Sequence, residues 1–168
     1  MNDVAGVSWY AVMKLLHVLS AFWVVTGMLA RPVVLAAARR APDMRILKAI
    51  ADVSGRLEDL MVAPGLLAVL VTGVATALIG GIPLFGPFAG GPSWVFLSLL
   101  IMLLVVALTP VTLMRDRRWG QALEEAAREG AVTARLRTFL TRDAMIRRYA
   151  PDVVVMFVIV TLMVTKPF

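Results

Sequence analysis

Residues 9–30 read WYAVMKLLHVLSAFWVVTGMLA. A helix needs about 20 apolar residues to cross the ~30 Å hydrocarbon core of a bilayer, so this run is long enough to do so. Three further apolar runs lie at about residues 61–79, 94–114 and 149–165. Because lipid offers the backbone no hydrogen-bond partner, each run should be helical. The sequence therefore predicts an all-α polytopic membrane protein: a four-transmembrane-helix bundle in one integral membrane domain, residues 1–168.

The composition agrees with a membrane protein and excludes several kinds of site. Hydrophobic residues make up 60% of the 168 residues, above the share of about 45–50% in soluble domains. The chain contains no cysteine, which excludes disulfides and thiolate metal sites. It also has no nucleotide-binding loop, catalytic triad or metalloprotease motif. The first run is longer than a signal-peptide core and no A-x-A-like cleavage site follows it, so we expect it to remain as a membrane helix.

Lysine and arginine are distributed unevenly between the loops. The loop 31–60 holds six of them and the loop 115–148 holds nine, whereas the loop 80–93 carries no charge. Positively charged loops stay in the cytoplasm, so we predict a multi-pass protein of the bacterial inner (plasma) membrane with both termini outside. The net charge of +6 then reflects topology, and we expect the lipid bilayer rather than nucleic acid as the partner.

The two charged loops carry apolar residues at helical spacing. We predict amphipathic connecting helices there, which either bind a partner or anionic lipid, or act as solvated connectors. The first span should end at Arg31-Pro32. Asp152, directly after Pro151, should cap the fourth helix, because a carboxylate suits the positive end of the helix dipole.

The single histidine, His17, is the main candidate for chemistry. It lies eight residues after Trp9, about 12 Å into the apolar layer. A polar side chain at that depth is costly and is often functional. A neutral imidazole could ligate haem iron, copper or zinc, or accept a proton; the alternative is an interhelical hydrogen bond. Ser20, Gly27 and Arg31 share its helical face, which should point toward other helices.

A second ligand for His17 is not evident, because the chain has no other histidine and no cysteine. Methionines lie in or beside every span. Their thioethers can bind copper(I) or complete a haem site, although methionine also packs well in apolar helices. A dimer that offers His17 from each protomer is another possible arrangement.

The pattern Lys14-Leu-Leu-His17, followed by Trp23, Gly27 and Arg31, resembles the first helix of HemJ-type protoporphyrinogen oxidases. It also resembles a neighbouring bacterial family of uncharacterised four-helix membrane proteins and, more distantly, CopD-type copper-resistance proteins. Arg56-Leu57 ahead of Pro64, and the closing Val164–Phe168, are similar to HemJ as well.

The resemblance implies a haem b with His17 as its iron ligand, and with Lys14, Arg31 and Arg56 in the cofactor site, the two arginines near the propionates. Phe96 and Ser98 stand where the HemJ pattern has a histidine and a lysine, which favours the uncharacterised relatives over a true oxidase. The sequence thus predicts a haem-associated protein of redox type. The alternatives are a copper or small-solute binding or transport protein, and a non-catalytic membrane subunit that docks a partner through the loop 115–148.

Overall fold

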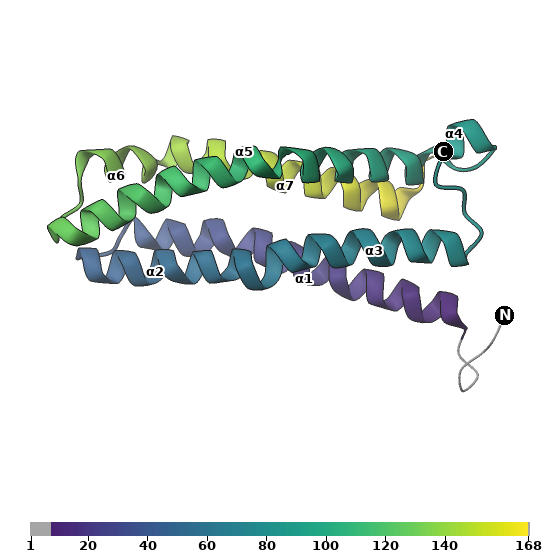
Figure 1. Ribbon diagram of the computed structural model, residues 1–168, viewed down its shortest axis with the longest axis horizontal. Coiled ribbons are helices and arrows are strands. Elements are labelled where there is room, and N and C mark those ends of the chain that lie inside the picture. The colour runs from purple at the N-terminus through teal and green to yellow at the C-terminus, as the bar shows by residue number, and fades with distance from the viewer. Residues whose placement is uncertain (1–7, 168) are drawn as a thin grey trace.

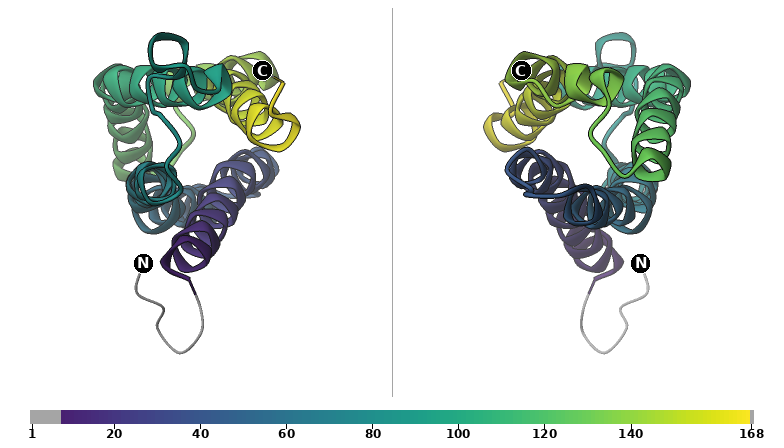
Figure 2. Two further views of the ribbon diagram at one scale, coloured as in Figure 1. Left: turned by 90° about the vertical axis from the view of Figure 1, so that its right-hand side faces the viewer. Right: turned by 90° about the vertical axis from the view of Figure 1, so that its left-hand side faces the viewer.

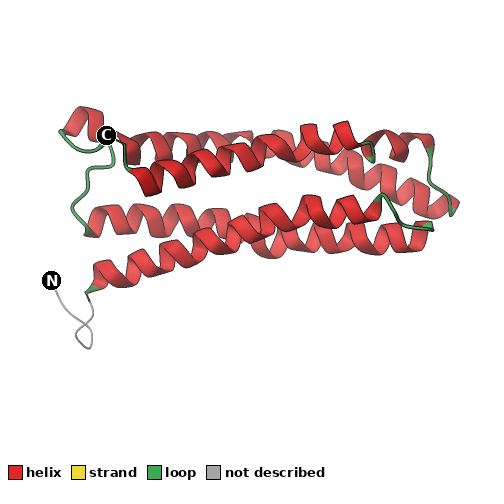
Figure 3. Cartoon of the chain, turned by 180° about the vertical axis from the view of Figure 1, so that it is seen from behind, coloured by secondary structure: helices red, strands yellow, loops and turns green. Residues whose placement is uncertain are grey.

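Helices make up all the regular structure in the part of the chain that the computed structural model describes (Figure 3). That part is residues 8–167, with side chains at every position except 109, 110 and 113. The elements are α1 (Trp9–Ala38), α2 (Met44–Leu57), the π-helical turn η1 (Glu58–Val62), α3 (Ala63–Ile79), α4 (Gly86–Ala89), α5 (Ser93–Glu129), α6 (Ala134–Phe139) and α7 (Arg142–Thr165). The all-α prediction is confirmed.

Three helices in the described part are long and apolar enough to cross a membrane: Trp9–Ala38, the continuous run Met44–Ile79 and Arg142–Thr165. The apolar stretch of α5, Ser93–Leu108, is shorter. The second apolar run of the sequence is therefore the end of a 36-residue helix, which α2, η1 and α3 form together without a break.

Two predicted helix boundaries are wrong. The first helix does not end at Arg31-Pro32 but continues through Pro32 to Ala38. Proline removes only one backbone hydrogen bond, and the burial of Leu35 and Ala38 beyond it favours a continued helix. Asp152 does not cap a helix either, because α7 begins ten residues earlier. There the Thr141 hydroxyl accepts a hydrogen bond of 3.2 Å from the Ala144 amide, as N-cap side chains do.

The helices form two groups that lie against each other, and the long helices within each group run antiparallel (Figures 1 and 2). One group is α1 with the long α2–η1–α3 helix, and the other is α5 with α6 and α7. The start of α2, the end of α5 and α6 lie at one end of the molecule, here called the α6 end. The start of α1, α4 and the end of α7 lie at the opposite end, the α4 end. Both basic segments of the sequence thus lie toward the α6 end.

The best-packed core lies in the half of the molecule toward the α6 end. Leu136, Ala122 and Ala126 are fully covered there, and side chains from α1, α2, α5 and α7 surround them. The other half has fewer buried side chains, among them Val95, Met102 and Met156. The exposed leucines and valines of α3, α5 and α7 suit a surface that meets lipid instead of water.

Glycines allow α1 and the α2–η1–α3 helix to approach closely. A Cβ at Gly27 would lie 2.7 Å from Met61 Cβ, and one at Gly65 would lie 2.9 Å from Val24 Cβ. Small residues at helix contacts serve this purpose in membrane proteins. The close approach brings the His17 ring against Gly73, where an added Cβ would lie 2.9 Å from His17 Cε1.

Candidate functional site

His17 lies half-buried between α1 and α3 and bonds across that contact. Its Nδ1 lies 3.1 Å from the Val69 carbonyl oxygen and 3.3 Å from Thr72 Oγ1. A carbonyl can only accept, so Nδ1 carries the proton and donates it. Thr72 fits this assignment, because its hydroxyl already donates to the Ala68 carbonyl at 2.5 Å and has a lone pair left for His17. The alternative of an interhelical hydrogen bond is thus realised in the structure.

The same hydrogen bonds leave His17 suited to bind a metal. With the proton on Nδ1, the free lone pair is on Nε2, the nitrogen that histidine commonly offers to a metal. Metal-bound histidines typically donate their other ring N–H to a carbonyl or carboxylate, which fixes the tautomer and the ring orientation. A neutral His17 would therefore offer Nε2 as a ligand atom. Among the described residues no group of three or more histidine, aspartate or glutamate side chains could hold a metal ion.

The structure does not bring the other predicted site residues to His17. Lys14, one turn away, is exposed, with its ammonium 6.0 Å from the centroid of the Tyr10 ring. Arg31 lies fourteen residues further along α1, which corresponds to about 21 Å along the helix axis. Arg56 is exposed on α2. Neither arginine lies where it could contact a cofactor bound to His17.

Arg31 instead belongs to a cluster of charged side chains, here called the ionic junction. Its guanidinium forms ion pairs with Glu58 of η1 and with Asp116 of α5, the second at 3.6 Å. Asp116 also accepts a hydrogen bond of 2.6 Å from Arg148 of α7. Arg115 donates to the Arg148 carbonyl at 3.3 Å. The ionic junction therefore joins the two helix groups at a point where α1, η1, α5 and α7 meet.

Aromatic rings complete the ionic junction. Tyr149 is buried, and the guanidinium carbons of Arg31 and Arg148 lie 5.5 and 5.4 Å from its ring centroid. Arg148 also lies 5.6 Å from the centroid of Trp119. Cations near aromatic faces gain electrostatic stabilisation, most strongly where water is excluded. The side chains of Arg31 and Arg148 are each only 12% exposed, so these contacts act in a largely desolvated site.

The π-helical turn positions Glu58 for this cluster. Turns of this kind are rare and usually occur as single bulges within α-helices, often at functional sites. Trp23 of α1 donates its indole N–H to the Leu60 carbonyl of the turn at 3.2 Å. The irregular segment is thus fixed to α1 on the same side as the Arg31–Glu58 pair.

A comparison with protein-family models matches residues 11–167 to DUF2269, described as a predicted integral membrane protein. The chain belongs to this family. The match to DUF2269 supports a membrane protein and gives no support to a relationship with HemJ-type or CopD-type proteins. No curated protein and no solved structure matches the chain.

The charged residues of this DUF2269 protein that sequence reasoning missed are Glu58, Asp116 and Arg148. Each lies at the polar edge of an apolar run, where we interpreted charges only as topology signals. A usable signal was present, because Glu58 and Asp116 are acidic residues at the ends of apolar runs, as Arg31 is a basic one. The partners come from separate helices, so no local pattern links them.

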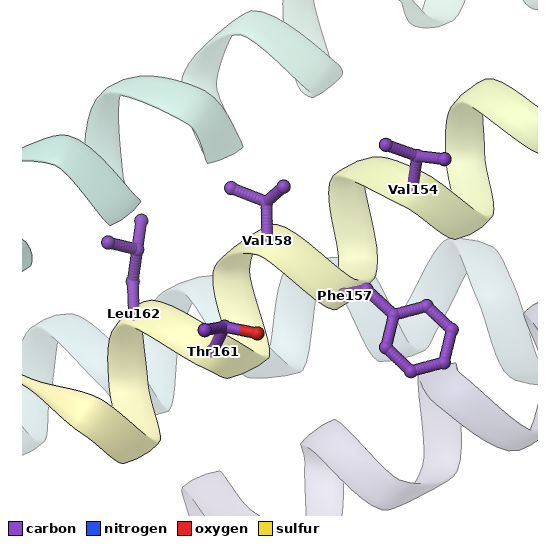
Figure 4. Close-up of a pocket in the computed structure, with 5 residues that line it drawn as sticks. All are labelled: Val154, Phe157, Val158, Thr161 and Leu162. Carbon is purple, nitrogen blue, oxygen red and sulfur yellow. The ribbon is translucent and has the colours of Figure 1, made fainter.

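One hollow on the surface of α7 is apolar. It has a volume of about 350 Å³ and is lined by residues of α7 alone (Figure 4): Val154, Phe157, Val158, Thr161 and Leu162. Thr161 supplies the single hydroxyl, which cannot form a catalytic constellation with its aliphatic neighbours. Because Val154 and Phe157 are more than half exposed, we interpret this hollow as part of the surface that meets lipid.

Proposed function

We propose that this DUF2269 protein spans the bacterial inner membrane four times, with both termini outside, and binds a haem b through His17. Besides the three helices that are long enough to cross the membrane, the apolar part of α5 would form the remaining span. The basic segments 31–60 and 115–148 lie toward the same end of the molecule (Figure 1), which is the arrangement expected if both face the cytoplasm. The uncharged segment 80–93 lies at the opposite end, with the start of α1 and the end of α7.

The ionic junction supports this placement. Arg31, Glu58, Asp116 and Arg148 contact one another, although they belong to different helices, and each lies next to an apolar run. Toward the α4 end, the helix that contains Glu58 has no charged residue between Asp59 and Ile79, about 30 Å of helix. That length equals the thickness of the hydrocarbon core. The ionic junction would then lie at the cytoplasmic membrane surface.

The observation that carries the haem proposal is the hydrogen bonding of His17. Val69 and Thr72 engage Nδ1, which leaves Nε2 as the basic nitrogen of a ring held in place at membrane depth. An oriented, neutral imidazole of this kind is the axial ligand in many haem proteins. When bound, a haem would supply electron-transfer or oxidation chemistry. Of this chain's side chains, His17 would hold the iron, and any second ligand would come from water or from another chain.

A reduced-minus-oxidised absorption spectrum tests the proposal. The protein would be expressed with ample haem, purified in detergent and compared with His17→Ala and His17→Asn. Asparagine retains a donor for the Val69 carbonyl but is a poor ligand for haem iron, so it separates loss of ligation from loss of the helix contact. We expect a b-type spectrum from the unchanged protein and none from either variant.

Ser20→Ala is the matched control, because Ser20 is one turn from His17 and its hydroxyl donates only to the Leu16 carbonyl at 2.7 Å. Its spectrum should equal that of the unchanged protein. A spectrum that survives His17→Asn would show that His17 is not the ligand. A featureless spectrum from the unchanged protein would reject the haem, and copper analysis of the same preparation would then test the alternative metal.

A further inference from the structure

The segment 80–92, here called the α4 corner, exposes two phenylalanines at the α4 end of the molecule. Phe88 is 83% exposed and Phe85 is 59% exposed. No aspartate, glutamate, lysine or arginine occurs in this segment. A loop that projects into water usually carries polar side chains. The composition of the α4 corner therefore indicates that its exposed side chains do not face bulk water.

A backbone hydrogen bond and close contacts define the shape of the α4 corner. The Gly91 amide donates to the Gly86 carbonyl at 2.9 Å, and a Cβ at Gly86 would lie 2.2 Å from the Pro92 carbonyl oxygen. Gly90 ends α4 with a φ of +68°, a conformation that glycine adopts without strain. The two phenylalanines are therefore presented by a fixed, self-packed turn.

Both rings lie beside the exposed side of α5. Phe85 and Phe88 lie 6.3 and 5.8 Å from the ring centroid of Phe96. At 3.6 residues per turn, Phe96 shares one helical stripe with Leu100 and Leu103, which are about half exposed. The buried face of α5, marked by Val95, Ser98 and Met102, points elsewhere. In Figure 2, α4 accordingly lies outside the arrangement of long helices.

We propose that the α4 corner is an interfacial anchor, which inserts Phe88 and Phe85 into the lipid leaflet at the α4 end. The exposed stripe of α5 runs from this leaflet into the bilayer, and the two rings continue it without a charged residue between them. An uncharged apolar surface beside a span favours the boundary between headgroups and acyl chains. The inference rests on the four-span arrangement proposed above and is independent of haem binding.

The chain has no cysteine, so single-cysteine variants can report on this position. Phe88→Cys would carry a nitroxide label in vesicles of phosphatidylethanolamine and phosphatidylglycerol. Oxygen concentrates in the bilayer and a nickel chelate stays in water, so their relative access to the label measures immersion. Two reference positions are Leu104→Cys, on the exposed face of α5, and Glu129→Cys, exposed at the end of α5.

We expect the oxygen-to-nickel access ratio at residue 88 to exceed that at residue 129 several-fold and to be below or near that at residue 104. A label at 88 that nickel reaches freely, with residue 104 still shielded from nickel, would overturn the anchor and leave the four spans intact. A label at 88 that neither reagent reaches would overturn it in favour of a second copy of the chain. Nickel access at 104 would overturn the four-span arrangement itself.

Discussion

At the residue scale, the most informative side chain is His17, whose partners fix the tautomer of its neutral ring. Val69 can only accept a hydrogen bond, and Thr72 has already committed its hydroxyl proton to Ala68. In the neutral ring, Nε2 is thereby left with a lone pair. That His17 lies inside the first helix could be predicted from the sequence, because one long apolar run surrounds it. Its partners could not, because Val69 and Thr72 are more than fifty residues away in the chain.

Gly27 should be among the least replaceable residues of α1. Gly27→Ala would place a Cβ 2.7 Å from Met61 Cβ and 3.1 Å from Val62 Cγ2. The helices would have to separate, and overpacking of this kind typically costs about 1–3 kcal/mol. We expect a lower unfolding midpoint in detergent, measured by circular dichroism.

Gly55→Ala is the matched control, because nothing lies within 4 Å of a Cβ at that position in α2. Alanine is the better helix former by about 0.5–1 kcal/mol, so this variant should unfold at a slightly higher temperature. If both variants changed the midpoint equally, close approach at Gly27 would not be what stabilises the α1 contact.

At the element scale, the ionic junction determines how helices from the two groups are held together. The Arg31–Glu58 pair lies within the first group and the Arg148–Asp116 pair within the second. Arg31 then reaches Asp116 across the boundary. Removing one partner of a half-buried ion pair lowers the free energy of unfolding by more than the pair itself contributes, because the remaining charge loses its counterpart.

The Arg148–Asp116 pair can be measured with a double-mutant cycle. Arg148→Met and Asp116→Asn should each lower the free energy of unfolding by about 1.5–3 kcal/mol, the range for hydrogen bonds to charged groups. Asp116→Asn should cost more, since Asp116 also meets Arg31. The double variant should lose less than the sum, and strictly additive losses would contradict direct coupling.

The exposed Lys48–Asp52 pair of α2 is the comparison for this cycle. It has a similar distance, 2.9 Å, but its side chains are 42% and 51% exposed. Surface pairs of this kind contribute at most about 1 kcal/mol. Lys48→Met should therefore leave the unfolding midpoint nearly unchanged.

The helices themselves could be predicted because long apolar runs admit no other backbone structure in lipid. Their ends could not. Pro32 and Pro151 suggested boundaries, yet both lie inside helices, α1 and α7. Packing of residues on either side, such as Leu35 and Tyr149, overrides the local preference. The ionic junction escaped prediction for a similar reason, since every ion pair within it joins residues of different helices.

At the scale of the whole molecule, the topology makes a prediction for labelling in cells. Single cysteines at Ala49, Glu129 and Pro167, all exposed, report on the two basic segments and on the end of the molecule where α7 finishes. A membrane-impermeant maleimide should react with Pro167→Cys in intact spheroplasts. It should react with Ala49→Cys and Glu129→Cys only in inverted vesicles.

The denatured protein serves as the control for total reactivity in each preparation. Reaction of residues 49 and 129 from opposite sides would contradict the four-span topology. Reaction of both from outside, with residue 167 inside, would keep the spans and reverse the orientation. The positive-inside rule, applied to the lysine and arginine counts, predicts that this reversed orientation is not observed.

The helix from Met44 to Ile79 joins two different surroundings in one continuous element. Its first part, from Met44 to Glu58, is about 21 Å long and packs through Met44, Leu47 and Ala51 into the core at the α6 end. Helices adjust to a thinner or thicker bilayer by tilting. If the apolar part of this helix spans the membrane as proposed, a tilt would have to be accommodated by that core, so membrane thickness would be coupled to the packing at the α6 end.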